Sequence, residues 1–346
     1  MECIQVLDWA AGPKYTTVEP PPEPDANSVR VRVVAVGQHH VVRSMASGKH
    51  YASGSLPHTP GMDGVGVDTS TGNLVYFSLM GVRGAGGSYV GIVNVPRSHV
   101  WEIPSGVDPV QAAALMNPAM SSWMALKERV DFLKSSQQSS LPADWTCLVI
   151  GATSISGRLA VKIARLLGAK AVFGAARNAS KLDAIDLDGR IVLQDPPEAT
   201  DFSAAANVSV VLDYLYGPYP EVFLKCAARA TLKQRAAQHP APSRPLTYVS
   251  IGSVAGSEAA IPSAVLRGKD TTLRGAGIGS WDVEALGDET PAMLAILEGV
   301  SVPEVKAVSV KEAERVWNGT GSGSGSAAAG ERLVFVFDEA YVTRYS

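Results

Sequence analysis

The sequence has few cysteines and no long apolar run, and each absence excludes a class of protein. Cys3, Cys147 and Cys226 lie far apart and form no Cys-x-x-Cys pair, so neither a disulfide framework nor a zinc finger is expected. No stretch approaches the roughly 18 apolar residues that a membrane-spanning helix needs. The first residues also lack the pattern of a signal peptide. We therefore predict a cytoplasmic protein that does not cross a membrane.

Neither positive nor negative charge predominates in the chain. The net charge is −3, and charged residues make up 18% of the chain without a basic stripe or polybasic run. Nucleic acid and an anionic membrane surface are therefore not expected as partners. The 346 residues are 46% hydrophobic. That composition is typical of a globular protein, and the length favours two domains.

The pattern of apolar residues changes along the chain. Up to about residue 110, alternating segments such as SVRVRVVAVG at 28–37 predict β-strands. From Trp145 on, short apolar runs alternate with amphipathic segments, which predicts parallel strands joined by helices. The predicted fold class is therefore α/β, with a β domain and a doubly wound parallel-sheet domain.

Three further predictions concern the segments around these domains. The helical segment 108–130 contains Pro118, which is expected to divide it into two helices. The final apolar run, RLVFVF at 332–337, is expected to return to the N-terminal β domain. The Gly/Ser/Ala-rich stretch before that run predicts a flexible loop.

Cofactor chemistry is first indicated by GATSISG at 151–157, which lies between an apolar strand and an amphipathic helix. Gly151 suits a tight turn, Gly157 allows close helix packing, and Ser154 stands where a dinucleotide-binding loop has its middle glycine. Backbone N–H groups and the helix dipole converge at such a turn and favour phosphate. A bare strand-to-helix turn gives the same pattern, so the loop alone leaves both interpretations open.

The next strand favours the nucleotide interpretation. NAD-specific folds place an acidic residue about twenty residues beyond the loop, where it binds the ribose hydroxyls. Here Arg177 and Lys181 follow the strand at 171–176 instead, and no acid stands at its end. Two cations suit a 2′-phosphate, so we predict NADP(H). The alternative is that both are ordinary solvated surface residues.

Taken in order, the motifs resemble the medium-chain dehydrogenase/reductase superfamily, in its zinc-free quinone oxidoreductase-like and enoyl reductase branch. The segments that carry the resemblance are PHTPGMDGVGV, IPSGVDPVQAAALMNPAMSSWMAL, GATSISG, VVLDYLYG, YVSIGSVAG and LRGKDTTLRGAGIG. The resemblance implies a GroES-like domain formed by residues 1–118 and 302–346 around a Rossmann domain of residues 119–301. It also implies a homodimer formed through the last strands of the Rossmann sheets.

The same resemblance argues against a catalytic zinc. Met62 stands where zinc alcohol dehydrogenases have a ligand histidine, Asp63 replaces the acid beside it, and His39 matches the ligand cysteine position. A catalytic zinc needs three protein ligands, so we predict no metal. Without a Lewis acid, hydride addition to a quinone or to an activated C=C bond of an enone or enoyl compound is favoured.

The candidate site residues follow from these motifs. His39, which matches a cleft asparagine of quinone oxidoreductases, and Tyr51 are predicted to donate to the substrate; a solvent-facing loop is the alternative. The predicted cofactor-binding residues are Ser121, Gly151, Thr153, Ser154, Ile155, Gly157, Arg177, Lys181, Tyr216 and Gly252. The predicted function is an NADPH-dependent oxidoreductase. The alternative is a catalytically weak NADPH-binding accessory or sensor protein of the same fold.

Overall fold

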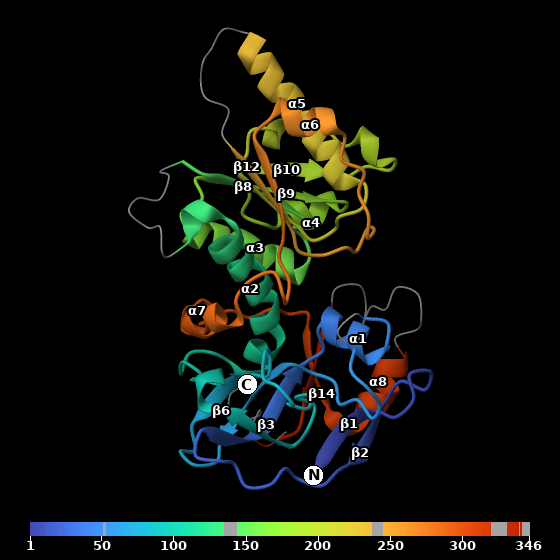
Figure 1. Ribbon diagram of the computed structural model, residues 1–346, viewed down its shortest axis with the longest axis vertical. Helices are drawn as coiled ribbons and strands as arrows, with labels where there is room; N and C mark the ends of the chain where they lie inside the picture. The colour runs from blue at the N-terminus through green and yellow to red at the C-terminus, as the bar shows by residue number, and fades with distance from the viewer. Residues whose placement is uncertain (51–52, 135–143, 237–244, 320–330, 339, 341–346) are drawn as a thin grey trace. The chain divides into compact units, whose positions relative to one another are not determined.

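The computed structural model describes residues 1–50, 53–134, 144–236, 245–319, 331–338 and 340. The chain forms two compact units, the first made of Met1–Asn117 with Val283–Ser346 and the second of Pro118–Asp282 (Figure 1). The chain rejoins the first unit at Val283, earlier than the predicted residue 302. Val283 lies against Gly81 of this unit, since a Cβ added to Gly81 would lie 2.8 Å from Cγ1 of Val283.

The first unit is built on a seven-stranded sheet with the order β14-β15-β3-β4-β5-β7, and β6 also pairs with β3. Among the described strands of this sheet, β14 and β15 pair in parallel and the other pairs are antiparallel. A separate hairpin joins β1 and β2. The strands are β1 Glu2–Val6, β2 Pro13–Thr17, β3 Ser28–Gly37, β4 Asp63–Asp68, β5 Leu74–Ser78, β6 Ile92–Pro96, β7 Val100–Glu102, β14 Val305–Ser309 and β15 Arg332–Val336, and the helices are α1 His40–Ala46, α7 Val283–Ala295 and α8 Ala313–Gly319.

The return of the C-terminal strand is confirmed. In β15, Val334, Phe335 and Val336 pair antiparallel with Gly37, Val36 and Ala35 of β3. Both partners are buried, because this half of β3 is apolar on both faces. The pairing places Arg332, the first residue of β15, beside the end of β3. The Gly/Ser/Ala-rich loop predicted before β15 lies outside the described residues.

The prediction that Pro118 divides its helix is wrong. One helix, α2, runs from Pro109 to Arg129 with Pro118 inside it. Proline removes one helical hydrogen bond, but the surrounding residues are buried and apolar, including Leu115, Met116 and Ala119. Burial of the helix on both sides of the proline outweighs the lost bond, and the helix continues.

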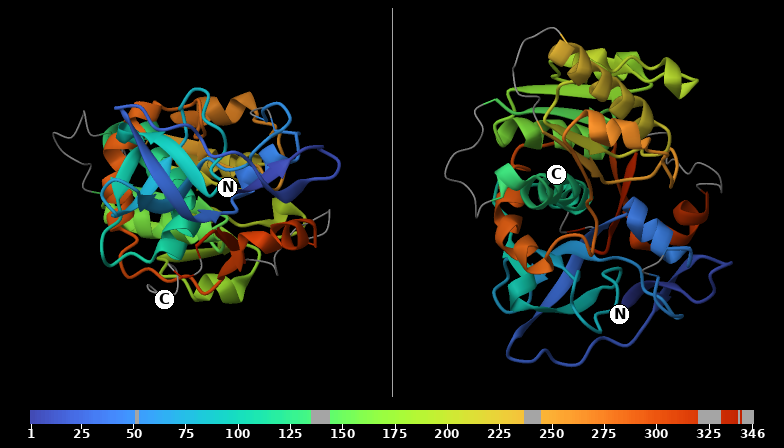
Figure 2. Two further views of the ribbon diagram at one scale, coloured as in Figure 1. Left: turned by 90° about the horizontal axis from the view of Figure 1, so that it is seen from below. Right: turned by 45° about the horizontal axis from the view of Figure 1, so that its top comes forward.

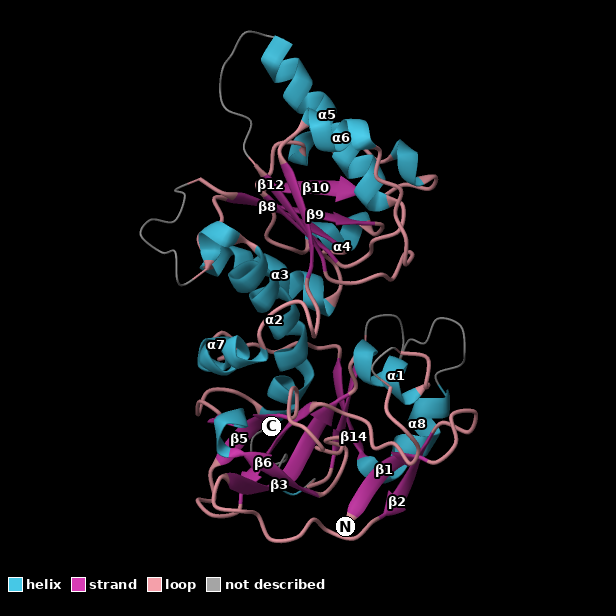
Figure 3. Ribbon diagram, viewed as in Figure 1, coloured by secondary structure: helices cyan, strands magenta, loops and turns pink. Residues whose placement is uncertain are grey.

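The second unit is a six-stranded parallel sheet with the order β10-β9-β8-β11-β12-β13, the strand order of a Rossmann fold. Helices α5 and α6 cover one face of this sheet and α3 covers the other (Figures 2 and 3). The strands are β8 Thr146–Ile150, β9 Ala171–Ala176, β10 Gly189–Val192, β11 Val210–Asp213, β12 Leu246–Ser250 and β13 Thr271–Gly275, and the helices are α3 Ile155–Leu166, α4 Ala179–Asp183, α5 Tyr219–Ala236 and α6 Ser263–Gly268.

The core of this unit follows from alternation along its strands. Leu148 and Ile150 of β8 pack in one cluster with Phe223 and Leu224 of α5. The residues between them point to the opposite face, where α3 buries Leu159 and Ile163. The α/β fold class with a Rossmann-like parallel sheet is therefore confirmed. No helix among the described residues is long and apolar enough to cross a membrane.

Candidate functional site

The turn between β8 and α3 requires both of its glycines. Gly151 has a φ of +93°, a region that side chains with a Cβ rarely enter. At Gly157 an added Cβ would lie 2.3 Å from the carbonyl oxygen of Gly151, so only glycine lets α3 start this close to the turn. The first-turn N–H groups of Ile155 and Ser156 have no partner four residues earlier in the helix. This geometry suits a phosphate group.

Ser154 is the N-cap of α3, and its hydroxyl is engaged inside the loop. The hydroxyl donates to the carbonyl oxygen of Gly151 at 2.9 Å and accepts from the N–H of Gly157 at 3.0 Å. The hydroxyl proton of Ser154 is therefore used in a hydrogen bond within the turn and is not free for a ligand. The side chain is exposed at the loop surface beside Thr153, which is half-buried. The groups that this loop can offer to a phosphate are therefore its backbone N–H groups.

Two cations stand at the end of the neighbouring strand. Arg177 directly follows β9, and Lys181 lies in α4, whose N-cap Asn178 accepts from the Lys181 N–H at 2.9 Å. Both side chains are exposed, and neither makes a hydrogen bond or ion pair with another residue that the structure describes. Because β9 is next to β8 in the sheet, these cations and the glycine turn follow the carboxyl ends of adjacent strands.

A buried aspartate shapes the turn after β11. The carboxylate of Asp213, fully buried, accepts from the N–H groups of Leu215 and Tyr216 at 2.8 and 3.0 Å and from the Tyr248 hydroxyl at 2.7 Å. Burial raises the pKa of Asp213, while these three donors oppose the rise. The hydrogen bonds to Asp213 hold Tyr216 at a φ of +54°, a conformation that costs about 1–3 kcal/mol in a residue with a side chain.

The predicted cofactor residues Tyr216 and Gly252 belong to neighbouring turns. Gly252 follows β12, and a Cβ added there would lie 2.5 Å from the carbonyl oxygen of Tyr214. Tyr216 forms a parallel bridge with Gly256, so the turns after β11 and β12 run together beyond the sheet. Asp213, which organises both, was not predicted. The signal was present in the sequence, because it is an acid that ends the apolar strand VVLD.

Ser121 lies on α2 and bonds within its own helix. Its hydroxyl donates to the carbonyl oxygen of Pro118 at 2.7 Å, the behaviour of an ordinary helical serine. The next residue, Ser122, is fully buried and lies 2.6 Å from the hydroxyl of Tyr214. The prediction that Ser121 contacts a cofactor therefore stays a prediction.

In the first unit, His39 lies in a buried polar network. Its Nδ1 is 3.1 Å from Nη1 of Arg332, and its Nε2 is 3.5 Å from Oδ1 of Asp63. The other carboxylate oxygen of Asp63 accepts from the Tyr76 hydroxyl at 2.9 Å. His39, Asp63 and Tyr76 are 1%, 3% and 1% exposed. Arg332 was not predicted as part of any site, and a cation opening an apolar strand was its only sequence signal.

The network assigns the protonation of His39. A guanidinium only donates, so Nδ1 must accept, and a neutral ring then carries its proton on Nε2 toward Asp63. Burial lowers the pKa of His39, although the Asp63 carboxylate opposes this. Nε2 makes no hydrogen bond with another described residue, and donation from it to a substrate would turn its proton away from Asp63. Tyr51, the second predicted donor, lies outside the described residues.

The position of the zinc-ligand histidine has a different chemistry in this chain. Met62 is 7% exposed, and its Sδ lies 3.6 Å from Nδ2 of Asn117. Among the residues that the structure describes, no three His, Cys, Asp or Glu side chains are grouped to hold a metal ion.

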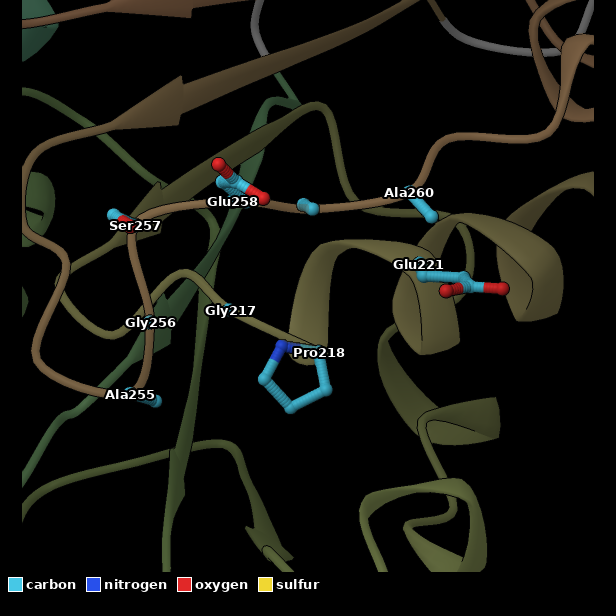
Figure 4. A pocket seen from close by; sticks show the side chains of 9 residues that line it. Gly217, Pro218, Glu221, Ala255, Gly256, Ser257, Glu258 and Ala260 are labelled. Atoms are coloured by element: carbon cyan, nitrogen blue, oxygen red, sulfur yellow. The ribbon is translucent and has the colours of Figure 1, made fainter.

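A shallow pocket of about 390 Å³ lies beyond β11 and β12 in the second unit (Figure 4). The carboxylates of Glu221, from the first turn of α5, and Glu258 are among its lining groups. Glu221 pairs with Lys225 at 2.6 Å. Carboxylates repel a phosphate, so the glycine turn with its neighbouring cations is the better phosphate site. The residues that line the pocket are Gly217, Pro218, Glu221, Ala255, Gly256, Ser257, Glu258, Ala259 and Ala260.

Known proteins resemble this chain over its whole length. No family model matches it. A protein of Emericella nidulans named "Probable NADPH-dependent quinone reductase tdiC" is 30% identical over 383 aligned residues, which cover 97% of this chain and 100% of that protein. The solved quinone oxidoreductase of Thermus thermophilus has a TM-score of 0.67 at 20% identity, covering 97% of this chain and 100% of its own. That of Escherichia coli, complexed with NADPH, has a TM-score of 0.69 at 18% identity with the same coverage.

The two solved structures establish the fold, and the relative from Emericella nidulans establishes the family. The predicted resemblance is therefore confirmed, and the chain belongs to the zinc-free quinone oxidoreductase branch of the medium-chain dehydrogenase/reductase superfamily.

Proposed function

We propose that this protein is an NADPH-dependent quinone reductase. The observation that carries the proposal is the glycine turn after β8 together with the exposed cations Arg177 and Lys181 after β9, whose side chains pair with no other described residue. The full-length relative is named as an NADPH-dependent quinone reductase, and this supports the same cofactor and substrate class here.

The residues present fit the cofactor. The N–H groups of Ile155 and Ser156 at the start of α3 would hold the pyrophosphate, and Arg177 with Lys181 would hold the 2′-phosphate. Gly151, Gly157 and Gly252 carry no side chain and would let the backbone approach the cofactor closely. When bound, NADPH supplies the hydride. The protein's part is to orient the cofactor and to stabilise the charge that develops on the substrate oxygen.

For that charge we keep His39 and Tyr51 as the proposed donors. Tyr51 is a neutral phenol donor. His39 can donate from Nε2 only if its proton turns from Asp63, and the 3.5 Å separation is long for a hydrogen bond. Bound water is the alternative proton source for a quinone.

Enones and enoyl compounds form the second proposed substrate class. They need the same donor, because hydride addition to their C=C bond also places charge on a carbonyl oxygen. An accessory role without catalysis is not favoured, since the whole-length relative is named as a reductase. The three unpaired thiols Cys3, Cys147 and Cys226 are consistent with the cytoplasm.

The decisive experiment follows NADPH oxidation by absorbance with a panel of quinones, enones and enoyl thioesters. We expect turnover with at least one quinone, and a higher kcat/KM with NADPH than with NADH. Turnover of enones alone would move the proposal to the second class. Tight NADPH binding with no oxidation by any member of the panel would favour the accessory role.

We also propose a homodimer formed through β13. This strand is at the edge of the parallel sheet, and only β12 pairs with it among the described residues. Its Leu273 is 44% exposed, which is unusual for an apolar strand residue. Light scattering should give twice the monomer mass, and Leu273→Lys should shift it toward the monomer. A monomeric wild-type protein at micromolar concentration would contradict the proposal.

A further inference from the structure

The hydroxyls of Ser122 and Tyr214 connect two elements of the second unit. Ser122 lies on α2 and is fully buried, whereas Tyr214 directly follows β11 and is 8% exposed. Their oxygens are 2.6 Å apart.

The placement of the two protons can be inferred from the neighbours. The Ser122 oxygen also lies 3.4 Å from the carbonyl oxygen of Pro118 and 3.5 Å from that of Ser156. Carbonyl oxygens only accept. Each hydroxyl proton therefore has an acceptor when the Tyr214 hydroxyl donates to Ser122 and the Ser122 hydroxyl donates to a backbone carbonyl oxygen. Burial raises the pKa of Tyr214 to about 12, so its phenol keeps this proton at neutral pH.

Tyr214 is also in contact with the turns on both sides of its strand. A Cβ added to Gly151 would lie 3.2 Å from the Tyr214 Cβ, and one added to Gly252 would lie 2.5 Å from the Tyr214 carbonyl oxygen. Ser156, which the Ser122 hydroxyl approaches, is in the first turn of α3. The hydrogen-bonded pair thus links α2 to the turns that follow β8, β11 and β12.

We propose that Ser122 and Tyr214 are positioning residues that hold these turns in the conformation that binds NADPH. The inference rests on the proposed function, because it assumes that NADPH binds at the 151–157 turn. Neither hydroxyl needs to touch the cofactor. The apparent affinity of a ligand falls with the fraction of protein in the binding conformation. Loosening the pair should therefore weaken binding and leave turnover at saturation unchanged.

The test compares Tyr214→Phe, Ser122→Ala and the double variant by NADPH fluorescence titration and by steady-state kinetics. Each single variant should weaken NADPH binding about 3- to 10-fold, the effect of one lost hydrogen bond. The double variant should lose less affinity than the two single losses multiplied together, because both single variants remove the Tyr214–Ser122 bond. The turnover number at saturating NADPH should stay within about twofold of wild type.

Thr231→Val is the matched control. Thr231 is fully buried in the same unit, and its hydroxyl donates to the carbonyl oxygen of Ala227 within α5. It should lower the melting temperature without changing the Kd for NADPH. Wild-type affinity in both single variants, or effects that multiply in the double variant, would overturn the inference alone. Absence of NADPH binding by the wild-type protein would overturn the proposed function and this inference with it.

Discussion

A guanidinium nitrogen of Arg332 lies 3.1 Å from Nδ1 of His39, and this contact fixes the ring as a neutral acceptor on that side. Arg332 begins β15, whereas His39 directly follows β3. The pairing of these strands therefore brings a C-terminal cation to an N-terminal imidazole. Asp63 on the other side of the ring completes a chain of positive, neutral and negative groups, which limits the cost of burying the charges.

The buried row of Arg332, His39 and Asp63 predicts that the stability of the protein falls in mild acid. Burial lowers the pKa of His39 below the ordinary value of 6.5, so the unfolded chain takes up a proton before the folded one does. Its contribution to the free energy of unfolding is therefore complete above pH 6.5 and is lost as the pH falls through the lower folded pKa. Urea unfolding at a series of pH values between 5 and 8 measures this loss.

His39→Asn provides the comparison for that series. The variant should be less stable at pH 8, where the network is intact in the wild type, and its stability should change less as the pH falls. Some dependence will remain, because burial also lowers the pKa of His40 and His58. Parallel curves for the two proteins would show that His39 does not titrate on unfolding as inferred.

Cofactor preference should depend on Arg177. Arg177→Ala should raise the KM for NADPH by an amount corresponding to about 1–3 kcal/mol, the value of a lost charged hydrogen bond, and leave that for NADH little changed. Steady-state kinetics with both cofactors measure the difference. Arg97→Ala, which removes another exposed arginine, is the control and should change neither. Equal losses for both cofactors would refute the 2′-phosphate assignment.

The order of helices and strands could be predicted from the sequence. The spacing of apolar residues and the glycines that end an element are local features of the chain. The strands around 146–150, 171–176 and 210–213 and the helix after Gly151 all form where apolar runs and glycines predict them. The short strand β10 was missed, since its exposed Arg190 and Val192 leave little apolar signal. The prediction of a break at Pro118 was wrong, because a helix buried on several sides tolerates a proline that an isolated helix would not.

The candidate site was only partly predictable for a related reason. Gly151, Gly157 and Arg177 are recognisable from their positions relative to a strand. The partners of His39 are not, because Asp63 and Arg332 approach it only through the pairing of strands far apart in the chain. The same holds for Ser122 and Tyr214, which are 92 residues apart.

The 151–157 turn should tolerate glycine but not bulk at its middle position. Ser154→Gly removes the N-cap hydroxyl and should cost only a few tenths of a kcal/mol in stability, about what glycine costs at an N-cap, with NADPH binding retained. Ser154→Leu should block the cofactor, since this exposed side chain lies on the loop that we propose to bind the pyrophosphate. Titration calorimetry with NADPH measures both. If the leucine variant binds as the wild type does, the phosphates bind elsewhere.

The donor role can be tested at His39 and Tyr51 separately. Hydride addition places charge on the substrate oxygen, and a hydrogen-bond donor is the group that we propose to stabilise it. An oxyanion donor is worth about 10²–10³ in rate. Tyr51→Phe should therefore lower the turnover number far more than it weakens NADPH binding. His39→Ala should do the same if the ring releases Asp63 to donate, and should mainly lower the melting temperature if the buried network is its whole role. If both variants reduce a quinone at the wild-type rate, neither side chain is the donor, and bound water supplies the proton.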